Sequence, residues 1–329
     1  MRGFDPEFKT LPEYTLGITR AIWEDRGIGP ALSRYYSDDV IVRSSASLQV
    51  GNKDVAATTL ATLHQFPDRK LVGEDVIWAG DPEAGFLSSH RLISVMRHTG
   101  DGTLGKATGK VVRSRIIADC YIRENQVHEE WLVRDQAAFA NCLGMSSRSL
   151  AAVQIEREKR DGNEPQYFHP SVDRPSDYDP PIERGDPSVD TICSAYEEIW
   201  QSKDLSAVNR FYAEGCSFFA PGGSVRSGHA DIDEFLLGYL ASFPDARIVF
   251  RSAFVNRQAN AFDRVAMRFE IEATHSGWGF FGEPTGASVF IMGLSHAFVH
   301  DGRILMEWLA IDEVPIWKQV MHHAGSAAS

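Results

Sequence analysis

The feature that most constrains the fold is an internal repeat that covers most of the chain. Trp131 recurs as Trp308 and Asp135 as Asp312, in both cases 177 residues later. The same separation relates further matches: Ile22-Trp23 with Ile199-Trp200, Gly51 with Gly228, Phe66-Pro67-Asp68 with Phe243-Pro244-Asp245, His98 with His275, Gly105 with Gly282, and Thr108-Gly109 with Thr285-Gly286. One slip of a single residue occurs, where Tyr35-Tyr36 matches Phe211-Tyr212. A register held over this length indicates two copies of one domain.

Length and composition agree with two domains. The chain has 329 residues, enough for two cores of ordinary size, and it is 43% hydrophobic and 24% charged. Its formal net charge of −12 argues against a nucleic acid or an anionic membrane as partner. No run of about 18 apolar residues predicts a membrane span, and the first residues lack the apolar core of a secretory signal.

The four cysteines are scattered at Cys120, Cys142, Cys193 and Cys216, without a Cys-x-x-Cys pair. This pattern predicts reduced thiols in a cytoplasmic protein. Cys120 and Cys216 fall where apolar strand residues are expected, which favours packing over catalysis.

Each copy has its helices first and its strands afterwards. In the first copy, apolar spacing predicts helices at 13–25, 29–36 and 54–66. Strand-like runs follow at 70–79, 86–98, 109–123 and 126–135, and a short closing helix at 136–145. This order predicts an α+β fold, with about three helices packed on a strongly curved antiparallel sheet in each domain.

A polar, charged and proline-rich stretch separates the copies at residues 157–187. Such a composition predicts an extended linker. We therefore expect a first domain at 1–156 and a second at 188–329.

Several of these features together resemble one family. They are the three helices, the curved sheet, the Gly-x-x-Thr-Gly segments that begin at Gly105 and Gly282, and a strand pair that ends in Glu-Trp with an Asp four residues after the Trp. This combination resembles the SnoaL-like polyketide cyclases of the nuclear transport factor 2-like superfamily, which also holds ketosteroid isomerase, scytalone dehydratase and limonene epoxide hydrolase. The resemblance implies a cone-shaped domain around a mostly apolar pocket. It also implies pairing through the outer sheet face, within this chain as a pseudo-dimer or between chains as a homodimer. Since one scaffold hosts many chemistries, the resemblance says less about the reaction.

Strand alternation sorts the residues that could carry chemistry. Asp119 and Tyr121 share one face of the run 114–123, and His296 and Phe298 take the equivalent positions in the second copy. The resemblance implies an acid/base carboxylate on this penultimate strand, which corresponds to Asp119. An apolar pocket would raise its pKa, and a tyrosine hydroxyl could donate to an oxyanion. The alternative is that Asp119 pairs with a neighbouring arginine on a solvated face.

Three histidines lie on the long middle strands of the two copies. His98 and its repeat His275 are further catalytic candidates, and His90 is a candidate for substrate binding. The alternative for each is a core histidine whose hydrogen bonds are satisfied by neighbours.

Other substrate-binding candidates are aromatic or acidic residues near the ends of the last strands: Trp131, Asp135, Trp278, Phe298, Trp308 and Asp312. For Asp135, capping the following helix is the alternative. Glu130 and Glu307 lie on the opposite strand face, and we expect them to be structural or interface residues.

The chain contains no Gly-x-Gly-x-x-Gly segment, phosphate-binding loop, His-Glu-x-x-His or zinc-spaced cysteine pair. We therefore expect no cofactor and no metal. The leading hypothesis is a cofactor-independent enzyme that acts on a small organic molecule by acid/base chemistry, as an isomerase, dehydratase or other lyase, cyclase or hydrolase. The alternative is a non-catalytic module that binds a small ligand or serves assembly. Because Asp119 is replaced by His296, we expect the two pockets to have diverged.

Overall fold

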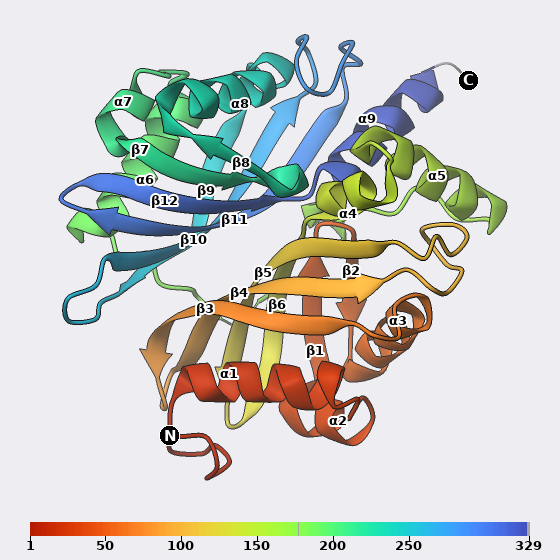
Figure 1. Ribbon diagram of the computed structural model, residues 1–329, viewed down its shortest axis with the longest axis vertical. Coiled ribbons are helices and arrows are strands. Elements are labelled where there is room, and N and C mark those ends of the chain that lie inside the picture. The colour runs from red at the N-terminus through yellow and green to blue at the C-terminus, as the bar shows by residue number, and fades with distance from the viewer. Residues whose placement is uncertain (177, 328–329) are drawn as a thin grey trace.

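The computed structural model describes residues 1–176 and 178–327, and it contains two six-stranded sheets with helices against each (Figure 1). The strand order is β2-β1-β6-β5-β4-β3 in the first sheet and β8-β7-β12-β11-β10-β9 in the second. The two orders are the same once the repeat is taken into account. The predicted α+β fold with two tandem domains is confirmed.

In the first domain two helices precede the sheet, one lies between its second and third strands, and two follow it. Its strands are β1 (Tyr36–Ser44), β2 (Ser47–Val50), β3 (Lys70–Asp81), β4 (Gly85–Arg97), β5 (Val111–Arg123) and β6 (Gln126–Arg134). Its helices are α1 (Leu11–Thr19), extended by a π-helical turn at Arg20–Glu24, α2 (Pro30–Tyr35), α3 (Asn52–Gln65), α4 (Gln136–Leu143) and α5 (Ser147–Arg160).

The second sheet repeats this arrangement. Its strands are β7 (Tyr212–Ala220), β8 (Ser224–Ser227), β9 (Arg247–Asn256), β10 (Asp263–Thr274), β11 (Ser288–His300) and β12 (Arg303–Ile311). Its helices are α6 (Pro187–Tyr196), extended by a π-helical turn at Glu197–Gln201, α7 (Ala207–Phe211), α8 (Gly228–Ser242) and α9 (Glu313–Ala327). Short 3₁₀ turns lie at Pro170–Val172 and Pro221–Gly223.

Local sequence explains several element boundaries. The Thr10 side chain accepts a hydrogen bond from the Glu13 backbone N–H at the start of α1 (3.3 Å), as an N-cap does. The β5–β6 hairpin turns through Glu124 and Asn125, both at positive φ, which suits the twist of the strands. The equivalent turn of the second domain uses Asp301 and Gly302 in the same conformation.

Each sheet departs from the expected antiparallel pattern at one strand pair. β1 pairs in parallel with β6, and β7 in parallel with β12. The reason is that β1 and β6 are far apart in the chain, so no tight hairpin fixes their relative direction. Two elements were not expected from the sequence: the short strand β2 and the helix α5, which continues past residue 157 to Arg160.

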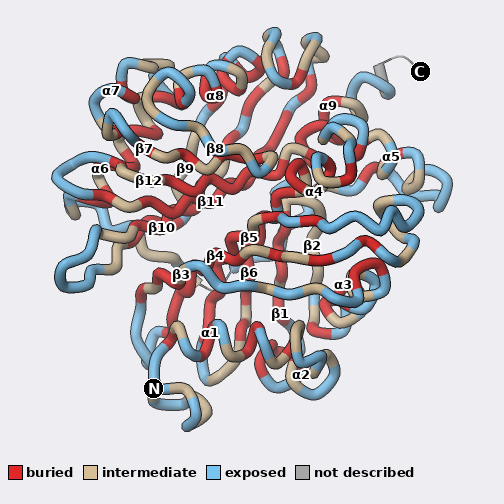
Figure 2. Tube along the Cα trace, viewed as in Figure 1, coloured by how far each residue is buried: buried red, intermediate tan, exposed pale blue. Residues whose placement is uncertain are grey.

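The two sheets pack against each other face to face, and the helices α1, α2, α7 and α8 lie on the outside (Figure 1). The strands that meet are buried, as the red strands in the middle of Figure 2 show. A cluster of apolar residues from both sheets fills the contact: Ile117, Tyr121, Trp131 and Val133 from the first, and Phe290, Met292, Leu294, Trp308 and Ala310 from the second. Each sheet is therefore buried on both faces.

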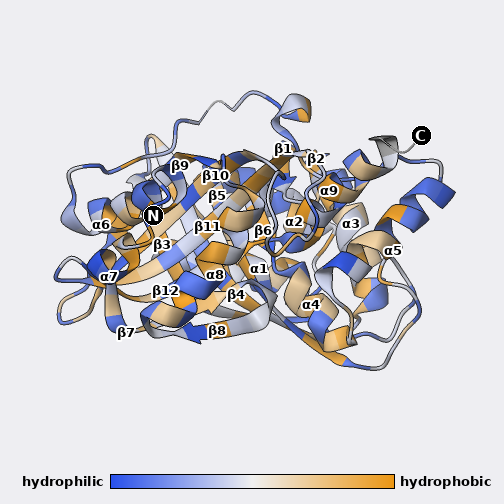
Figure 3. Ribbon diagram, turned by 90° about the horizontal axis from the view of Figure 1, so that it is seen from above, coloured by the Kyte–Doolittle hydropathy of each residue, from blue (hydrophilic) through white to orange (hydrophobic). Residues whose placement is uncertain are grey.

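The residues outside this stack are more polar. Seen from above, the hydrophobic residues gather in the central strands, and the segment between α5 and α6 runs along the outside (Figure 3). Of the helices in the described residues, none is long and apolar enough to cross a membrane.

Candidate functional site

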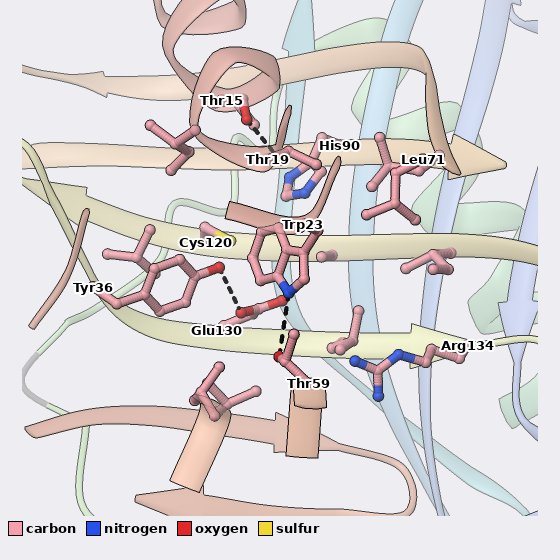
Figure 4. Close-up of a pocket in the computed structure, with 18 of the residues that line it drawn as sticks. Thr15, Thr19, Trp23, Tyr36, Thr59, Leu71, His90, Cys120, Glu130 and Arg134 are labelled. Atoms are coloured by element: carbon pink, nitrogen blue, oxygen red, sulfur yellow. Dashed lines mark hydrogen bonds between the residues drawn. The ribbon is translucent and has the colours of Figure 1, made fainter. Parts of the chain in front are cut away.

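A cavity lies inside the first domain, between the inner face of its sheet and the helices α1 and α3. One part of it, the Glu130 chamber, has a volume of about 60 Å³ and is lined by residues that include Trp23, Tyr36, Thr59, His90, Cys120 and Glu130 (Figure 4). A second part, the Phe139 chamber, has a volume of about 240 Å³ and is lined by residues that include Phe66, Met96, Leu104 and Phe139. Arg69 and Arg134 line both chambers, so the two parts are continuous.

Glu130 is the carboxylate of the smaller chamber. It lies on β6, is 7% exposed, and accepts one hydrogen bond from the Tyr36 hydroxyl at 3.0 Å. Burial raises the pKa of Glu130 above its usual value, although Arg134 and the Tyr36 hydroxyl oppose the shift. A raised pKa brings a carboxyl group closer to the range in which a general acid or base works.

His90 lies in the same chamber, on β4. It is 6% exposed, and its Nδ1 atom has no hydrogen-bond partner within the described structure. Burial lowers the pKa of His90 to about 4, so the imidazole is neutral over the physiological range. A neutral imidazole with a free ring nitrogen is available to a ligand as a donor or an acceptor, according to its tautomer.

Two arginines stand at the junction of the chambers. Arg134 is the last residue of β6, and Arg69 follows the Phe66-Pro67 turn that ends α3. Burial, together with the nearby charge of Arg134, lowers the pKa of Arg69 to about 9. Burial also lowers the pKa of Arg134, whereas the carboxylates of Glu130 and Asp312 raise it.

The corresponding space in the second domain is filled by side chains. At positions 177 residues later, larger residues replace the threonines: Thr19 becomes Tyr196, Thr58 becomes Phe235, Thr59 becomes Leu236 and Thr62 becomes Tyr239. Apolar residues replace the basic side chains: Arg69 becomes Ala246, His90 becomes Met267 and Arg134 becomes Ile311. All of these second-domain residues are buried in one apolar core. The inner part of the second cone is therefore packed, whereas its mouth keeps an open pocket of about 450 Å³ lined by residues that include Arg226, Phe235 and Phe281.

Glu307, the counterpart of Glu130, shows the same difference. It accepts hydrogen bonds from the Tyr196 hydroxyl, from the Tyr212 hydroxyl (2.7 Å) and from Ser295 Oγ (2.7 Å). In the first domain Thr19 and Ala118 stand where Tyr196 and Ser295 would be, so Glu130 keeps only the tyrosine at position 36. The sequence predicts a structural or interface residue at Glu130, and the structure adds that its side chain lines the cavity.

The structure places Asp119 outside the cavity, at the contact between the two sheets. The carboxylate is 1% exposed, and its Oδ2 atom accepts from Arg268 Nε at 3.3 Å and from Ser252 Oγ at 3.1 Å. Both partners belong to the second domain. The expectation that Asp119 works in a pocket of the first cone is therefore corrected: its strand face packs on the other sheet.

His296 occupies the matching place in the second domain and is also buried between the sheets. Its Nε2 atom is 2.8 Å from Ser89 Oγ, and its Nδ1 atom accepts from Arg91 at 3.2 Å. Burial lowers the pKa of His296 well below its usual value, and the charge of Arg91 adds to the shift. The expected catalytic role is corrected for the same reason as for Asp119.

The aromatic candidates on these strand faces also lie at the contact rather than in a cone. Tyr121 stacks on Tyr178 with ring centroids 4.0 Å apart, and its hydroxyl donates to the Ala84 carbonyl at 3.2 Å. The second-domain rings Phe298 and Trp308 pack edge to face, with centroids 4.9 Å apart.

Cations cover the two tryptophans of the contact. The Arg268 guanidinium lies 4.0 Å from the ring centroid of Trp131, and that of Arg43 lies 5.0 Å away. The Arg91 guanidinium lies 3.7 Å from the centroid of Trp308. Such cation–π contacts stabilise the packing of the sheets. Tyr121, Phe298 and Trp308 thus lie at the sheet contact, and Trp131 lines an open pocket of about 520 Å³ there, so their expected place inside the cones is corrected while substrate binding stays a prediction.

His98 and His275 have equal environments in the two domains. The Nδ1 atom of each is paired with the threonine of the Gly-x-x-Thr-Gly segment, Thr108 at 3.2 Å and Thr285 at 3.1 Å. Each ring also packs on the phenylalanine that ends a helix. The recurrence of this pair in both domains favours a structural role, although the Nε2 atom of each histidine is buried without a partner among the described residues, and the catalytic role stays a prediction.

Asp135 and Asp312 lie where the two domains meet at the edge of the Phe139 chamber. Asp135 caps α4 by accepting from Ala138 N–H (2.9 Å), and it also accepts from the N–H groups of Gly222 and Gly223 (both 3.0 Å). Asp312 accepts from Gln136 Nε2 at 2.8 Å, and burial raises its pKa to about 8. Trp278 is 70% exposed on a loop of the second domain, so the expectation that it lines a pocket is corrected.

Metal binding has no support in the described part of the chain, which contains no group of three or more His, Cys, Asp or Glu residues that could hold an ion. The polar groups of the two chambers are two guanidiniums, an imidazole, the carboxyl groups of Glu130, Asp135 and Asp312, glutamine amides, and hydroxyls.

Comparison with known proteins agrees with this fold. Residues 190–320 match the family model described as SnoaL-like polyketide cyclase. The comparison with curated proteins gave no match. Solved structures that are similar include IdmH from Streptomyces antibioticus, described as a candidate polyketide cyclase (15% identity, 41% of this chain and 100% of that one, TM-score 0.36).

Two further structures show the same likeness. They are a SnoaL-like candidate cyclase from Jannaschia sp. CCS1 (17% identity, 45% of this chain and 96% of that one, TM-score 0.37) and AclR from Streptomyces galilaeus, described as a candidate hydroxylase (23% identity, 40% and 80%, TM-score 0.35). At these identities and scores, the solved structures say nothing about the reaction. The family match therefore lies within the second domain, and the chain is a tandem of two domains with the same strand order.

Proposed function

We propose that the first domain is a small-molecule enzyme that works by acid/base chemistry, with Glu130 as the proton carrier. The observation that carries the proposal is the difference between Glu130 and Glu307. Glu307 is closed off by three hydroxyl groups, whereas Glu130 has one such partner and borders a cavity. The second domain, whose cone is packed, serves in this proposal as the support that buries the outer face of the first sheet.

The reaction class that suits the chamber is proton transfer next to a carbonyl group. The Glu130 carboxylate takes a proton from the carbon, and the electrons of the C–H bond move onto the carbonyl oxygen as an enolate. The guanidinium of Arg134, on the same strand, stabilises the negative charge on that oxygen. The enolate then takes the proton back at another carbon, which is isomerisation, or attacks a second carbonyl, which is cyclisation. Neither step needs a cofactor.

The environment of Glu130 sets the pH dependence that we expect. Because burial raises its pKa, the carboxylate form is lost at a higher pH than for an exposed glutamate. The rate of proton abstraction should therefore fall as the pH is lowered through this raised pKa.

The test is a proton-exchange assay that needs no knowledge of the natural substrate. Small β-keto esters and 1,3-diketones are incubated in D₂O with the protein, and the loss of the α-proton signal is followed by NMR. We expect the wild-type protein to accelerate exchange for at least one compound, and Glu130→Gln to lower the rate by about 10²-fold or more.

Glu307→Gln is the matched control, because it is the same substitution in the packed cone. It should leave the exchange rate within about twofold of wild type in protein that remains folded. If ligands bind but Glu130→Gln exchanges protons as fast as wild type, the proposal is wrong. The cavity would then belong to a non-catalytic binding module.

A further inference from the structure

The junction of the two chambers contains two guanidiniums without hydrogen-bonded partners among the described residues: that of Arg69, a half-buried residue, and that of Arg134, an exposed one. Neither Arg69 nor Arg134 makes a side-chain hydrogen bond or an ion pair with another described residue, and Arg69 Nε is buried without any partner. A guanidinium has five donors, and one that is enclosed by protein normally meets a carboxylate or several carbonyl groups. We infer that the cavity binds a small organic carboxylate, whose anionic group lies at the junction between Arg69 and Arg134.

The location of this site rests on the proposed function, but the inference does not require any reaction. It concerns the charge of the ligand and the way it is oriented. A planar guanidinium can donate two parallel hydrogen bonds to a carboxylate, which gives geometric specificity as well as affinity.

The carboxyl groups near the junction use their hydrogen bonds on other partners than the two arginines. Asp135 is committed to three backbone N–H groups, from Ala138, Gly222 and Gly223. Asp312 accepts from Gln136, and burial raises its pKa to about 8, so it is largely uncharged at neutral pH. Glu130 is bonded to Tyr36, and burial raises its pKa as well. The donors of the two guanidiniums therefore stay open to a ligand in the cavity.

The fold itself does not demand arginines at these positions. In the second domain the equivalent residues are Ala246 and Ile311, both buried in the apolar core. The same backbone thus accepts apolar side chains at these points. The buried Nε–H of Arg69 costs desolvation energy while it has no acceptor, and a bound anion would offset that cost.

The shapes of the chambers decide where the rest of the ligand lies. The Glu130 chamber, at about 60 Å³, has room only for a short fragment. The Phe139 chamber, at about 240 Å³, has an apolar wall built from Phe66, Met96, Leu104 and Phe139. An aromatic or aliphatic body therefore fits the Phe139 chamber, with the carboxylate at the arginines.

A matched pair of probes tests this inference. 2-Naphthoate and 2-naphthamide share one ring system and differ in charge, and their binding is measured by titration calorimetry at pH 7.5 and low salt. We expect wild-type protein to bind the naphthoate about tenfold or more tightly than the amide, with a preference that shrinks at high salt.

The variants are Arg134→Ile and Arg69→Ala, which install the residues that the second domain uses at these positions. We expect each to reduce the preference for naphthoate to about twofold or less while leaving the affinity for naphthamide within about twofold. Retained naphthamide binding shows that the cavity is intact. Arg160→Ala, which removes a charge from the exposed end of α5, is the control and should keep the preference. Arg134→Gln replaces the isoleucine variant if that protein does not fold.

Equal affinity of the wild-type protein for the two probes would overturn the inference, as would a preference that survives Arg134→Ile and Arg69→Ala. Absence of binding by both probes would do the same, because the Phe139 chamber would then be closed to an aromatic carboxylate. Failure of the proposed function gives a different result: naphthoate still binds preferentially, but Glu130→Gln leaves proton exchange unchanged.

Discussion

The ion pair between Asp119 and Arg268 offers a sharp test of how the two domains hold together. The two side chains are 1% and 3% exposed, and Arg268 Nε lies 3.3 Å from Asp119 Oδ2. At an effective dielectric constant of about 20, their attraction is about 5 kcal/mol. Removing each ion from water costs several kcal/mol, so the intact pair contributes little net stability.

Breaking the pair has a different consequence, because it leaves one charge buried alone. Asp119→Asn removes the negative charge and keeps the shape, so Arg268 is left with Ser252 and the ring of Trp131 as neighbours. We expect the free energy of unfolding to fall by about 3–5 kcal/mol. Replacing both partners by apolar residues, as in Asp119→Leu with Arg268→Met, should recover most of that loss.

Urea unfolding followed by circular dichroism gives these energies, and a double-mutant cycle isolates the coupling between the two side chains. Naphthoate binding, measured in folded protein, should be unchanged in Asp119→Asn, because this residue lies outside the cavity. The reasoning is refuted if Asp119→Asn loses less than about 1 kcal/mol. It is also refuted if the variant is as stable as wild type yet has lost proton exchange, which would return Asp119 to a catalytic role.

Two further predictions concern the cavity. The pKa of His90 is about 4 in the folded state, below that of a free imidazole, so the unfolded chain takes up the proton first as the pH falls. Between pH 7 and pH 5, wild type should therefore lose about 2 kcal/mol more unfolding free energy than His90→Met, which carries the residue found in the second domain. Urea unfolding at the two pH values measures this difference. Equal losses in both proteins would contradict a buried neutral imidazole. Tyr239 is fully buried in the second cone, so Tyr239→Thr should lower the free energy of unfolding by about 3–5 kcal/mol in urea unfolding. The converse variant, Thr62→Tyr, should fill the Phe139 chamber with little loss of stability. Titration calorimetry should then show that naphthoate no longer binds. Tight naphthoate binding by Thr62→Tyr would mean that the ligand lies elsewhere.

The sequence was sufficient for the repeat, for the α+β class and for most element boundaries, because each depends on local spacing. The same alternation correctly placed Asp119 and Tyr121 on one strand face. It could not tell which face lines the cone. When one face of a sheet is exposed to solvent, its polar residues identify it as the outer face. Here the second domain buries the outer face, so that face is apolar as well. Ile117 and Trp131 on the outer face are as apolar as Ile116 and Ala118 on the inner one. With no contrast between the faces, titratable residues of the domain contact were taken for a pocket.

The signal that would have located the cavity lies in the differences between the copies. Tyr36 and Glu130 recur as Tyr212 and Glu307, so the fold alone can account for this pair. Thr62, by contrast, stands where the second copy has a buried tyrosine. An unfilled volume inside a domain costs stability in proportion to its size, and the second copy shows that this backbone accepts side chains that fill it. The first copy therefore carries a cost that its own fold does not require. A ligand is the simplest explanation, because only an open cavity can bind one. The free energy of binding then offsets the stability that the cavity costs.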